Sequence, residues 1–142
     1  MNELDGLYFE DLEVGMTASY GKTITDADIV MFAGVSGDTN PLHLNAEYAA
    51  GTQFGSCIAH GMLSASFIST IFGTKLPGPG CIYMSQNLRF KAPVKVGETV
   101  IARVTVTELI PEKKRAKFLT QCTVGDTVVV DGDALIMAPS RA

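Results

Sequence analysis

The chain has 142 residues, of which 46% are hydrophobic and 18% are charged, and its formal net charge is −4. This length predicts a single domain spanning residues 1–142, and the hydrophobic content is enough for a core, which excludes a disordered segment. Because nucleic-acid binding needs a basic surface, the acidic composition argues against a nucleic-acid partner.

Cysteine usage and hydropathy indicate the compartment. The three cysteines, Cys57, Cys81 and Cys122, are widely and irregularly spaced without a CxxC pair, so neither a zinc site nor a disulfide framework is predicted. The N-terminal residues lack the basic start and apolar run of a signal peptide. The longest mostly apolar stretch, residues 61–73, is too short and too rich in serine to span a bilayer. We therefore expect a cytoplasmic protein with no membrane partner.

The first half of the chain predicts one strand and short helices. Residues 17–23 are rich in β-branched and aromatic side chains, which favours a strand. Thr25 followed by Asp28 has the spacing of a capping box, so a short helix is expected from residue 26 to about residue 35. Residues 38–43 are expected to form a loop, since Pro41 prevents the helix from continuing and biases the preceding residue toward extended geometry.

The middle of the chain predicts one further helical turn at residues 45–50 and then a long helix. The run from residue 61 to residue 76 is apolar on most sides, as in a buried helix, and a Pro-Gly-Pro-Gly sequence at residues 77–80 ends it.

The second half of the chain changes to the period of strands. Strands are expected at residues 83–90, 99–109, 115–124 and 127–137, with a two-residue hairpin at Gly125-Asp126 and a longer turn at residues 111–114. The predicted class is α+β, with an antiparallel sheet wrapped around a long central helix. The free edges of such a sheet invite pairing with a second copy, so a homodimer is expected.

Two residues in the segment DTNPLH (residues 38–43) are candidates for catalysis. Asp38 and His43 lie five residues apart across a segment stiffened by proline, so they can point at one small volume. A carboxylate and an imidazole that hold one water are what proton transfer requires. Asn40 can orient one of them through a side-chain hydrogen bond. Either residue alone is more typical of a solvated turn, and for the two together both interpretations stay open on this evidence.

The second histidine precedes the long helix. A helix N-terminus offers unpaired N–H groups, and Gly61 lets a ligand approach the backbone, which suits a thioester oxygen that becomes negative during a reaction. His60 is expected beside the substrate there, although packing or capping explains a histidine at this position equally well. Ala65, Ser69 and Phe72 share a helix face with Gly61 and form either an acyl groove or a close packing surface.

Other chemistry has no support in the sequence. It contains no glycine-rich phosphate loop, GxSxG elbow or metal motif, so we expect neither a cofactor nor a metal ion.

Four motifs occur together in this chain: DTNPLH at residues 38–43, HGM at residues 60–62, FKAPV at residues 90–94 and VGE at residues 96–98. With them the sequence resembles the MaoC-like hydratases, among them the (R)-specific enoyl-CoA hydratases of polyhydroxyalkanoate synthesis. The resemblance extends from about residue 9 to residue 137 and is specific because the first two motifs occur together. Glu98 replaces the more usual Asp at a surface turn.

The resemblance implies a hot-dog fold that dimerises, with its active sites near the interface. It implies Asp38 and His43 as a catalytic pair, Asn40 as a supporting residue and the Gly61 N–H as an oxyanion donor. Ser69 and Phe72 would border the acyl pocket. The implied reaction adds water reversibly to a trans-2-enoyl thioester, carried by coenzyme A (CoA) or acyl carrier protein, to give the (R)-3-hydroxyacyl thioester.

Three alternatives remain at this stage. A 3-hydroxyacyl-[acyl carrier protein] dehydratase catalyses the same chemistry on another carrier. Hot-dog proteins also include thioesterases and non-catalytic acyl-binding modules. His43 favours hydration over hydrolysis, because protonation of carbon needs a second proton-transfer group, and a binding module has no need of Asp38, Asn40 and His43 together.

Overall fold

The computed structural model describes residues 3–142. Its elements, in chain order, are η1 (Phe9–Asp11), β1 (Thr17–Thr23), α1 (Asp26–Ser36), α2 (Pro41–Leu44), α3 (Ala46–Ala50), α4 (Gly61–Thr74), β2 (Ile82–Phe90), β3 (Thr99–Ile110), η2 (Pro111–Lys113), β4 (Arg115–Val124) and β5 (Thr127–Met137). The strands and the three main helical segments lie where the sequence predicts them, within about two residues at each end.

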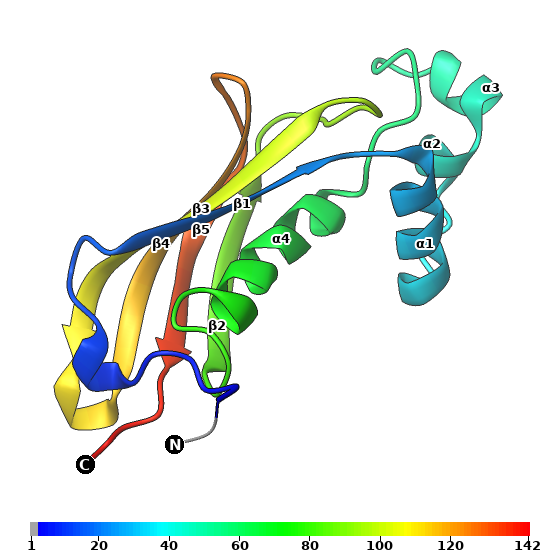
Figure 1. Cartoon of the computed structure of the whole chain (residues 1–142). Helices are drawn as coiled ribbons and strands as arrows, with labels where there is room; N and C mark the ends of the chain where they lie inside the picture. Colours follow the sequence, from blue (N-terminus) through cyan, green and yellow to red (C-terminus); the bar gives the residue numbers. More distant parts are fainter. Residues whose placement is uncertain (1–2) are drawn as a thin grey trace.

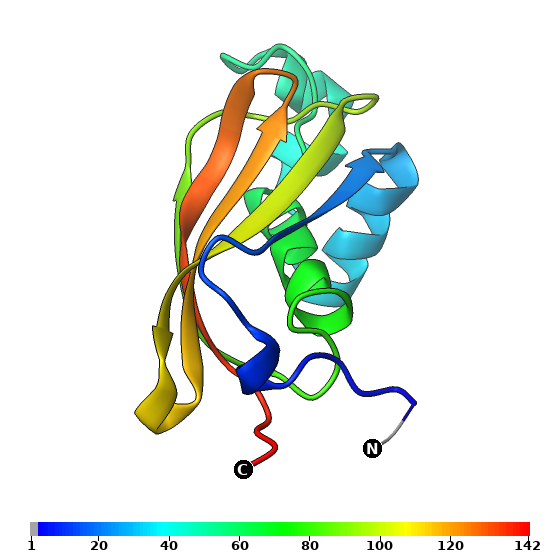
Figure 2. The ribbon, with the colours of Figure 1, turned by 60° about the vertical axis from the view of Figure 1, so that its left-hand side comes forward.

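The strands form one antiparallel sheet in the order β1-β3-β4-β5-β2. Consecutive hairpins join β3, β4 and β5, and the tight turn after Val124 pairs that residue with Thr127. β1 and β2 are therefore the edges of this sheet. The predicted α+β class and the antiparallel sheet around a long helix are confirmed (Figures 1 and 2).

The core lies between the sheet and α4, which runs along one face of the sheet in both ribbon views. On β3, alternate residues point inward, and Val100, Ala102, Val104 and Val106 are at most 1% exposed. α4 contributes Ile68, Ile71 and Phe72, none of them more than 1% exposed. Burial of each large apolar side chain contributes about 1.5–3 kcal/mol, so this contact holds the helix in place.

The segment at residues 38–43 differs from the predicted loop, because a helical turn, α2, begins inside it at Pro41. Proline is well tolerated at the first position of a helix, where its missing N–H would have no intrahelical partner. Asn40 stays outside the helical region (φ −48°, ψ 125°) and caps the turn by accepting a hydrogen bond from the Leu42 N–H at 3.0 Å. The proline thus starts a helix here instead of only ending one.

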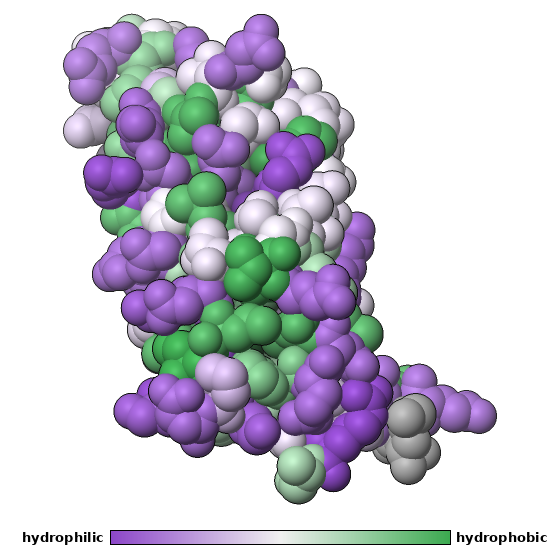
Figure 3. Space-filling view, turned by 90° about the vertical axis from the view of Figure 1, so that its left-hand side faces the viewer, coloured by the Kyte–Doolittle hydropathy of each residue, from purple (hydrophilic) through white to green (hydrophobic). Residues whose placement is uncertain are grey.

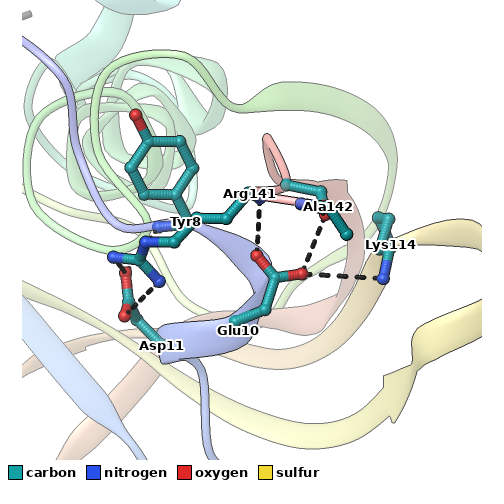
Figure 4. A network of polar contacts seen from close by, with 7 residues as sticks. Tyr8, Glu10, Asp11, Lys114, Arg141 and Ala142 are labelled. Carbon is teal, nitrogen blue, oxygen red and sulfur yellow. Dashed lines mark hydrogen bonds and ion pairs between the residues drawn. The ribbon is translucent and has the colours of Figure 1, made fainter. Parts of the chain in front are cut away.

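At the opposite end of the molecule from α2, polar contacts attach the C-terminal segment to η1 (Figure 4). The Arg141 guanidinium donates two hydrogen bonds to Asp11, at 2.8 and 2.9 Å, and lies 4.5 Å from the centre of the Tyr8 ring. Glu10 accepts hydrogen bonds from the Ser140 hydroxyl and the Arg141 backbone N–H and lies 3.5 Å from Lys114 Nζ. We call this set the terminal network.

The surface is mainly polar in the view of Figure 3, with hydrophobic side chains gathered on part of that face. Exposed hydrophobic side chains also follow the edge strand β2, where Ile82, Tyr83, Met84 and Phe90 are between 38% and 54% exposed. Within residues 3–142, none of the helices has both the length and the apolar character needed to cross a membrane.

Candidate active site

A cavity of about 460 Å³ lies at the N-terminal end of α4. Its walls come from residues near α2, from the start of α4, from the segment that follows β2, and from β5. Asp38, His43, His60 and Gly61 all line it. The fold therefore brings both histidines and the predicted catalytic aspartate to one place.

Asp38 follows the end of α1. Gly37 closes that helix in the left-handed conformation (φ 80°), which glycine adopts without steric cost, and the chain then turns toward the cavity. The Asp38 backbone N–H donates to Ser36 Oγ at 3.1 Å, and Asp38 Oδ1 accepts from the Asn40 N–H at 3.3 Å. Asn40 thus contacts Asp38 through its backbone N–H, whereas its side-chain oxygen caps α2 and does not orient Asp38 or His43 as the sequence suggested.

His43 lies on α2 and is half-buried. Its Nδ1 lies 2.7 Å from the carbonyl oxygen of Ile58. Because a carbonyl oxygen only accepts, Nδ1 must carry the hydrogen in this contact, and in the neutral ring Nε2 is then free to accept a proton. This assignment follows from the hydrogen-bond partner and gives His43 the form of a general base.

His60 immediately precedes α4 and is only 2% exposed. Its side chain does not cap the helix. Instead, Nε2 lies 2.9 Å from the backbone oxygen of Asp38, and its ring stacks on that of His43 with 3.9 Å between the ring centres. The side chain therefore contacts both members of the predicted pair.

Gly61 is the first residue of α4, where the backbone N–H has no partner within the helix. A side chain cannot be added here without a shift, because a Cβ would lie 2.5 Å from Cδ1 of Phe90. The absence of a Cβ thus admits the aromatic ring of Phe90, which also lines the cavity. In the sequence, Phe90 stands out only as part of the FKAPV motif, and no pattern there indicates its contact with Gly61.

The sequence analysis did not single out Ser64, which also lines the cavity. Ser64 is 1% exposed, and its Oγ has no hydrogen-bond partner among residues 3–142. The thiol of Cys122 donates to the Ser64 backbone oxygen at 3.5 Å, and burial raises the pKa of that thiol to about 12. Cys122 is therefore a packed thiol, and the unpaired hydroxyl of Ser64 is the polar group at this part of the wall.

Three residues predicted to contact the acyl chain lie elsewhere. Ala65 and Phe72 are buried in the core, and Ser69 is exposed, and none of them lines the cavity. The ring of Phe72 packs edge-on against Phe118 at 4.9 Å. Their role at the acyl chain stays a prediction, which requires an extension of the cavity beyond Ser64.

Asp38, His43 and His60 each have one potential ligand atom within 4.8 Å of the others, a spacing that some metal sites share. The two imidazole planes are only 26° from parallel. Since the lone pair of an imidazole nitrogen lies in the ring plane, stacked rings direct their lone pairs side by side instead of toward a common ion. The arrangement suits proton transfer better than metal binding.

Comparison with known proteins identifies the family. Residues 11–131 match the model of the MaoC like domain. The chain belongs to this family. The predicted resemblance is confirmed, and with it the hot-dog fold.

Relatives with assigned names match nearly the whole chain. It is 58% identical over 134 residues to an (R)-specific enoyl-CoA hydratase from Rhodospirillum rubrum, a match that covers 94% of this chain and 93% of the relative. It is 52% identical over 139 residues to a 3-hydroxybutyryl-CoA dehydratase from Methylorubrum extorquens, covering 98% of this chain and 88% of the relative.

Among solved structures, the R-hydratase PhaJ1 from Pseudomonas aeruginosa, in its unliganded form, superposes with a TM-score of 0.91 and 47% identity. That match covers 96% of this chain and 88% of PhaJ1. The (R)-hydratase from Aeromonas caviae gives a TM-score of 0.89 and 44% identity, covering 92% and 99% of the two chains.

Proposed function

We propose that this chain is an (R)-specific enoyl-CoA hydratase, a hydro-lyase that adds water reversibly to trans-2-enoyl-CoA. One observation carries the proposal: Asp38 and His43 line the same cavity, at the N-terminus of α4, with a carboxylate oxygen and an imidazole nitrogen within 4.8 Å of each other. The names of the relatives at 58% and 52% identity support this reaction.

The proposed mechanism uses only groups of this chain. Asp38 and the bare Nε2 of His43 hold one water molecule beside C3 of the substrate. The oxygen of this water bonds to C3, one of its protons passes to the pair, and electrons move onto the thioester oxygen. The Gly61 N–H donates to that oxygen as it becomes negative. The pair then returns one proton to C2, so the elements of water are added and no cofactor is consumed.

The carrier in this proposal is CoA, because the relatives at 58% and 52% identity are named as an enoyl-CoA hydratase and a 3-hydroxybutyryl-CoA dehydratase. A relative from Solanum lycopersicum at 38% identity is named as a 3-hydroxyacyl-[acyl-carrier-protein] dehydratase, so the carrier protein is the alternative. Initial rates with crotonyl groups on both carriers decide between them.

We further propose a cytoplasmic homodimer that forms through the β2 edge. An edge strand with exposed hydrophobic side chains is a ready surface for an isologous contact, and Phe90 at the end of β2 connects this edge to the cavity. Sedimentation at micromolar concentration should give a species of about twice the 15.1 kDa of one chain. A fully active monomer would refute the dimer.

The reaction is tested by following the enoyl-thioester absorbance of crotonyl-CoA while free thiol is measured in parallel. A hydratase removes the absorbance without releasing thiol. Rapid thiol release without 3-hydroxybutyryl-CoA would replace the proposal with a thioesterase.

A further inference from the structure

His60 connects the two members of the proposed catalytic pair. Its ring stacks on the His43 ring at 3.9 Å and also contacts Phe32, with ring centres 4.9 Å apart. Its Nε2 is 2.9 Å from the backbone oxygen of Asp38. A single buried side chain at the start of α4 thus contacts both the imidazole of one residue and the backbone of the other.

The hydrogen bond to Asp38 determines which nitrogen of His60 carries the hydrogen. A carbonyl oxygen only accepts, so Nε2 is the donor and Nδ1 of the neutral ring is bare. Nδ1 is buried and lacks a partner within residues 3–142. His43 has the opposite arrangement, with its hydrogen on Nδ1, toward Ile58. The two stacked rings are therefore held by backbone carbonyls in opposite tautomers.

We propose that His60 is a positioning residue that sets the orientation of the His43 ring and the place of Asp38, and that it does not itself bind the substrate. The proposal rests on the proposed hydratase function. Proton transfer is sensitive to geometry, and a shift of about 1 Å in a catalytic group can lower the rate roughly 10²-fold. A rigid stack on one ring and a hydrogen bond to the other residue are the contacts that prevent such a shift.

Two other roles for His60 agree less well with the structure. A helix cap would require a side-chain hydrogen bond to the first turn of α4, and His60 makes none. His60 lines the cavity, but a polar contact to the substrate would require an accessible nitrogen. The residue is 2% exposed, Nε2 already lies against the Asp38 oxygen, and Nδ1 is buried.

Two substitutions separate the contacts. His60→Phe keeps a flat ring for the stack and removes the donor to Asp38, whereas His60→Gln keeps a donor and removes the ring. Each should lower kcat roughly 10- to 100-fold with KM for crotonyl-CoA changed less than about threefold. Thr70→Ala, which removes a hydroxyl that donates to the Ser66 carbonyl within the same helix, is the control and should leave both constants unchanged.

A double substitution tests whether His60 acts through His43. In the His43→Gln background, adding His60→Gln should lower the residual kcat less than about threefold, because the ring that His60 orients is already absent. A rise in KM with unchanged kcat in the single variants would make His60 a substrate-binding residue. A full additional loss of kcat in the double variant would also overturn the proposal.

The tautomers provide a test that does not depend on activity. The chain has only two histidines, so ¹⁵N-labelled imidazole NMR of the native protein gives two ring systems. We expect one ring with its hydrogen on Nε2 and the other on Nδ1 at neutral pH, assigned by the loss of one system in His43→Gln. The same tautomer for both rings would contradict the stacked arrangement, even if the variants at position 60 fail to fold. If the tautomers are as expected but crotonyl-CoA is not hydrated, the proposed function fails and the arrangement of His60 does not.

Discussion

The terminal network and the cavity at the N-terminal end of α4 differ in how their polar groups are paired. In the terminal network, the carboxylates of Glu10 and Asp11 are each bound by Arg141 and its neighbours. At the cavity, His60 Nδ1 and Ser64 Oγ are buried without partners among residues 3–142, and Asp38 is exposed. Native proteins pair nearly all buried polar groups, so the unpaired ones deserve a functional explanation. The terminal network serves stability, whereas Asp38 and His43 at the cavity are available to a substrate.

The charged groups of the terminal network and the cavity also differ in their hydrogen-bond partners. The hydrogen bonds from the Arg141 side chain hold the pKa of the Asp11 carboxyl below its usual value, and the Arg141 backbone N–H lowers the pKa of Glu10. Both carboxyl groups are therefore fixed in their charged form near neutral pH. At the cavity, the contact of His43 Nδ1 with the Ile58 oxygen leaves Nε2 as the accepting nitrogen of the neutral ring.

The largest effect should come from the proposed catalytic pair. Asp38→Asn and His43→Gln keep the approximate size of each side chain but remove its capacity for proton transfer, so each should lower kcat by roughly 10²–10⁴. The double variant should be little slower than the slower single variant, because the pair acts as one unit. Asp126→Asn, at the exposed β4–β5 turn, is the matched control for the loss of a carboxylate. Retention of more than about half the rate in either single variant removes that residue from the mechanism.

The next effect concerns Phe72 and combines stability with chain length. Truncation of this buried ring to Ala should lower the free energy of unfolding by about 3–5 kcal/mol. Phe72 shares a helix face with Ser64, so the new space should extend the acyl cavity and raise kcat/KM for C8–C12 enoyl thioesters relative to crotonyl-CoA.

The matched control is Phe67→Ala, which removes a ring that packs on Tyr20 instead. It should cost similar stability in thermal or urea unfolding without a change in chain-length preference. An unchanged preference in Phe72→Ala would mean that the acyl pocket ends at Ser64.

A smaller effect should follow removal of the unpaired hydroxyl. Ser64→Ala eliminates a buried polar atom that has no partner in the described part of the chain, so the free energy of unfolding should rise by about 1 kcal/mol. Ser66→Ala, whose hydroxyl donates to the Leu63 carbonyl, is the control and should not raise stability. Urea unfolding measures both variants. A loss of stability in Ser64→Ala would show that this hydroxyl is paired in solution.

The smallest effect is expected at the terminal network. A carboxyl whose pKa is lower in the folded chain adds stability above the pKa of the unfolded chain, and this is lost as the pH falls through the folded value. Arg141→Ala should therefore lower Tm near neutral pH, leave kcat unchanged, and reduce the difference from the native protein as the pH falls into the acidic range. Arg103→Ala on the exposed face of β3 is the control. A Tm difference that does not vary with pH would show that Arg141 does not stabilise the fold through the charges of Glu10 and Asp11.

Local signals in the sequence were enough for most of the fold. The Thr25/Asp28 capping box, the alternation along β3 and the tight turn at Gly125 each depend on neighbouring residues and were predicted. The start of α2 at Pro41 was missed, because a proline that ends one helix has the same local appearance as a proline that begins another.

The candidate site was predictable in its residues but not in its contacts. Asp38, His43 and Gly61 were identified from motifs, and the structure places all three at one cavity. The stack of His60 on His43, the approach of Phe90 to Gly61 and the unpaired Ser64 hydroxyl depend on residues brought together by the sheet, so no spacing in the sequence indicates them. The predicted groove along Ala65, Ser69 and Phe72 assumed that a shared helix face lines one cavity. Ala65 and Phe72 are buried in the core and Ser69 is exposed, so their contact with an acyl chain stays a prediction.

The most direct measurement is the product that the protein forms from crotonyl-CoA in D₂O. Hydration by the pair of Asp38 and His43 should give 3-hydroxybutyryl-CoA with the (R) configuration at C3 and deuterium added at C2, and the Asp38→Asn variant should form it roughly 10²–10⁴ times more slowly. Crotonate and free CoA as the products, or an equal rate in the Asp38→Asn variant, would contradict the account.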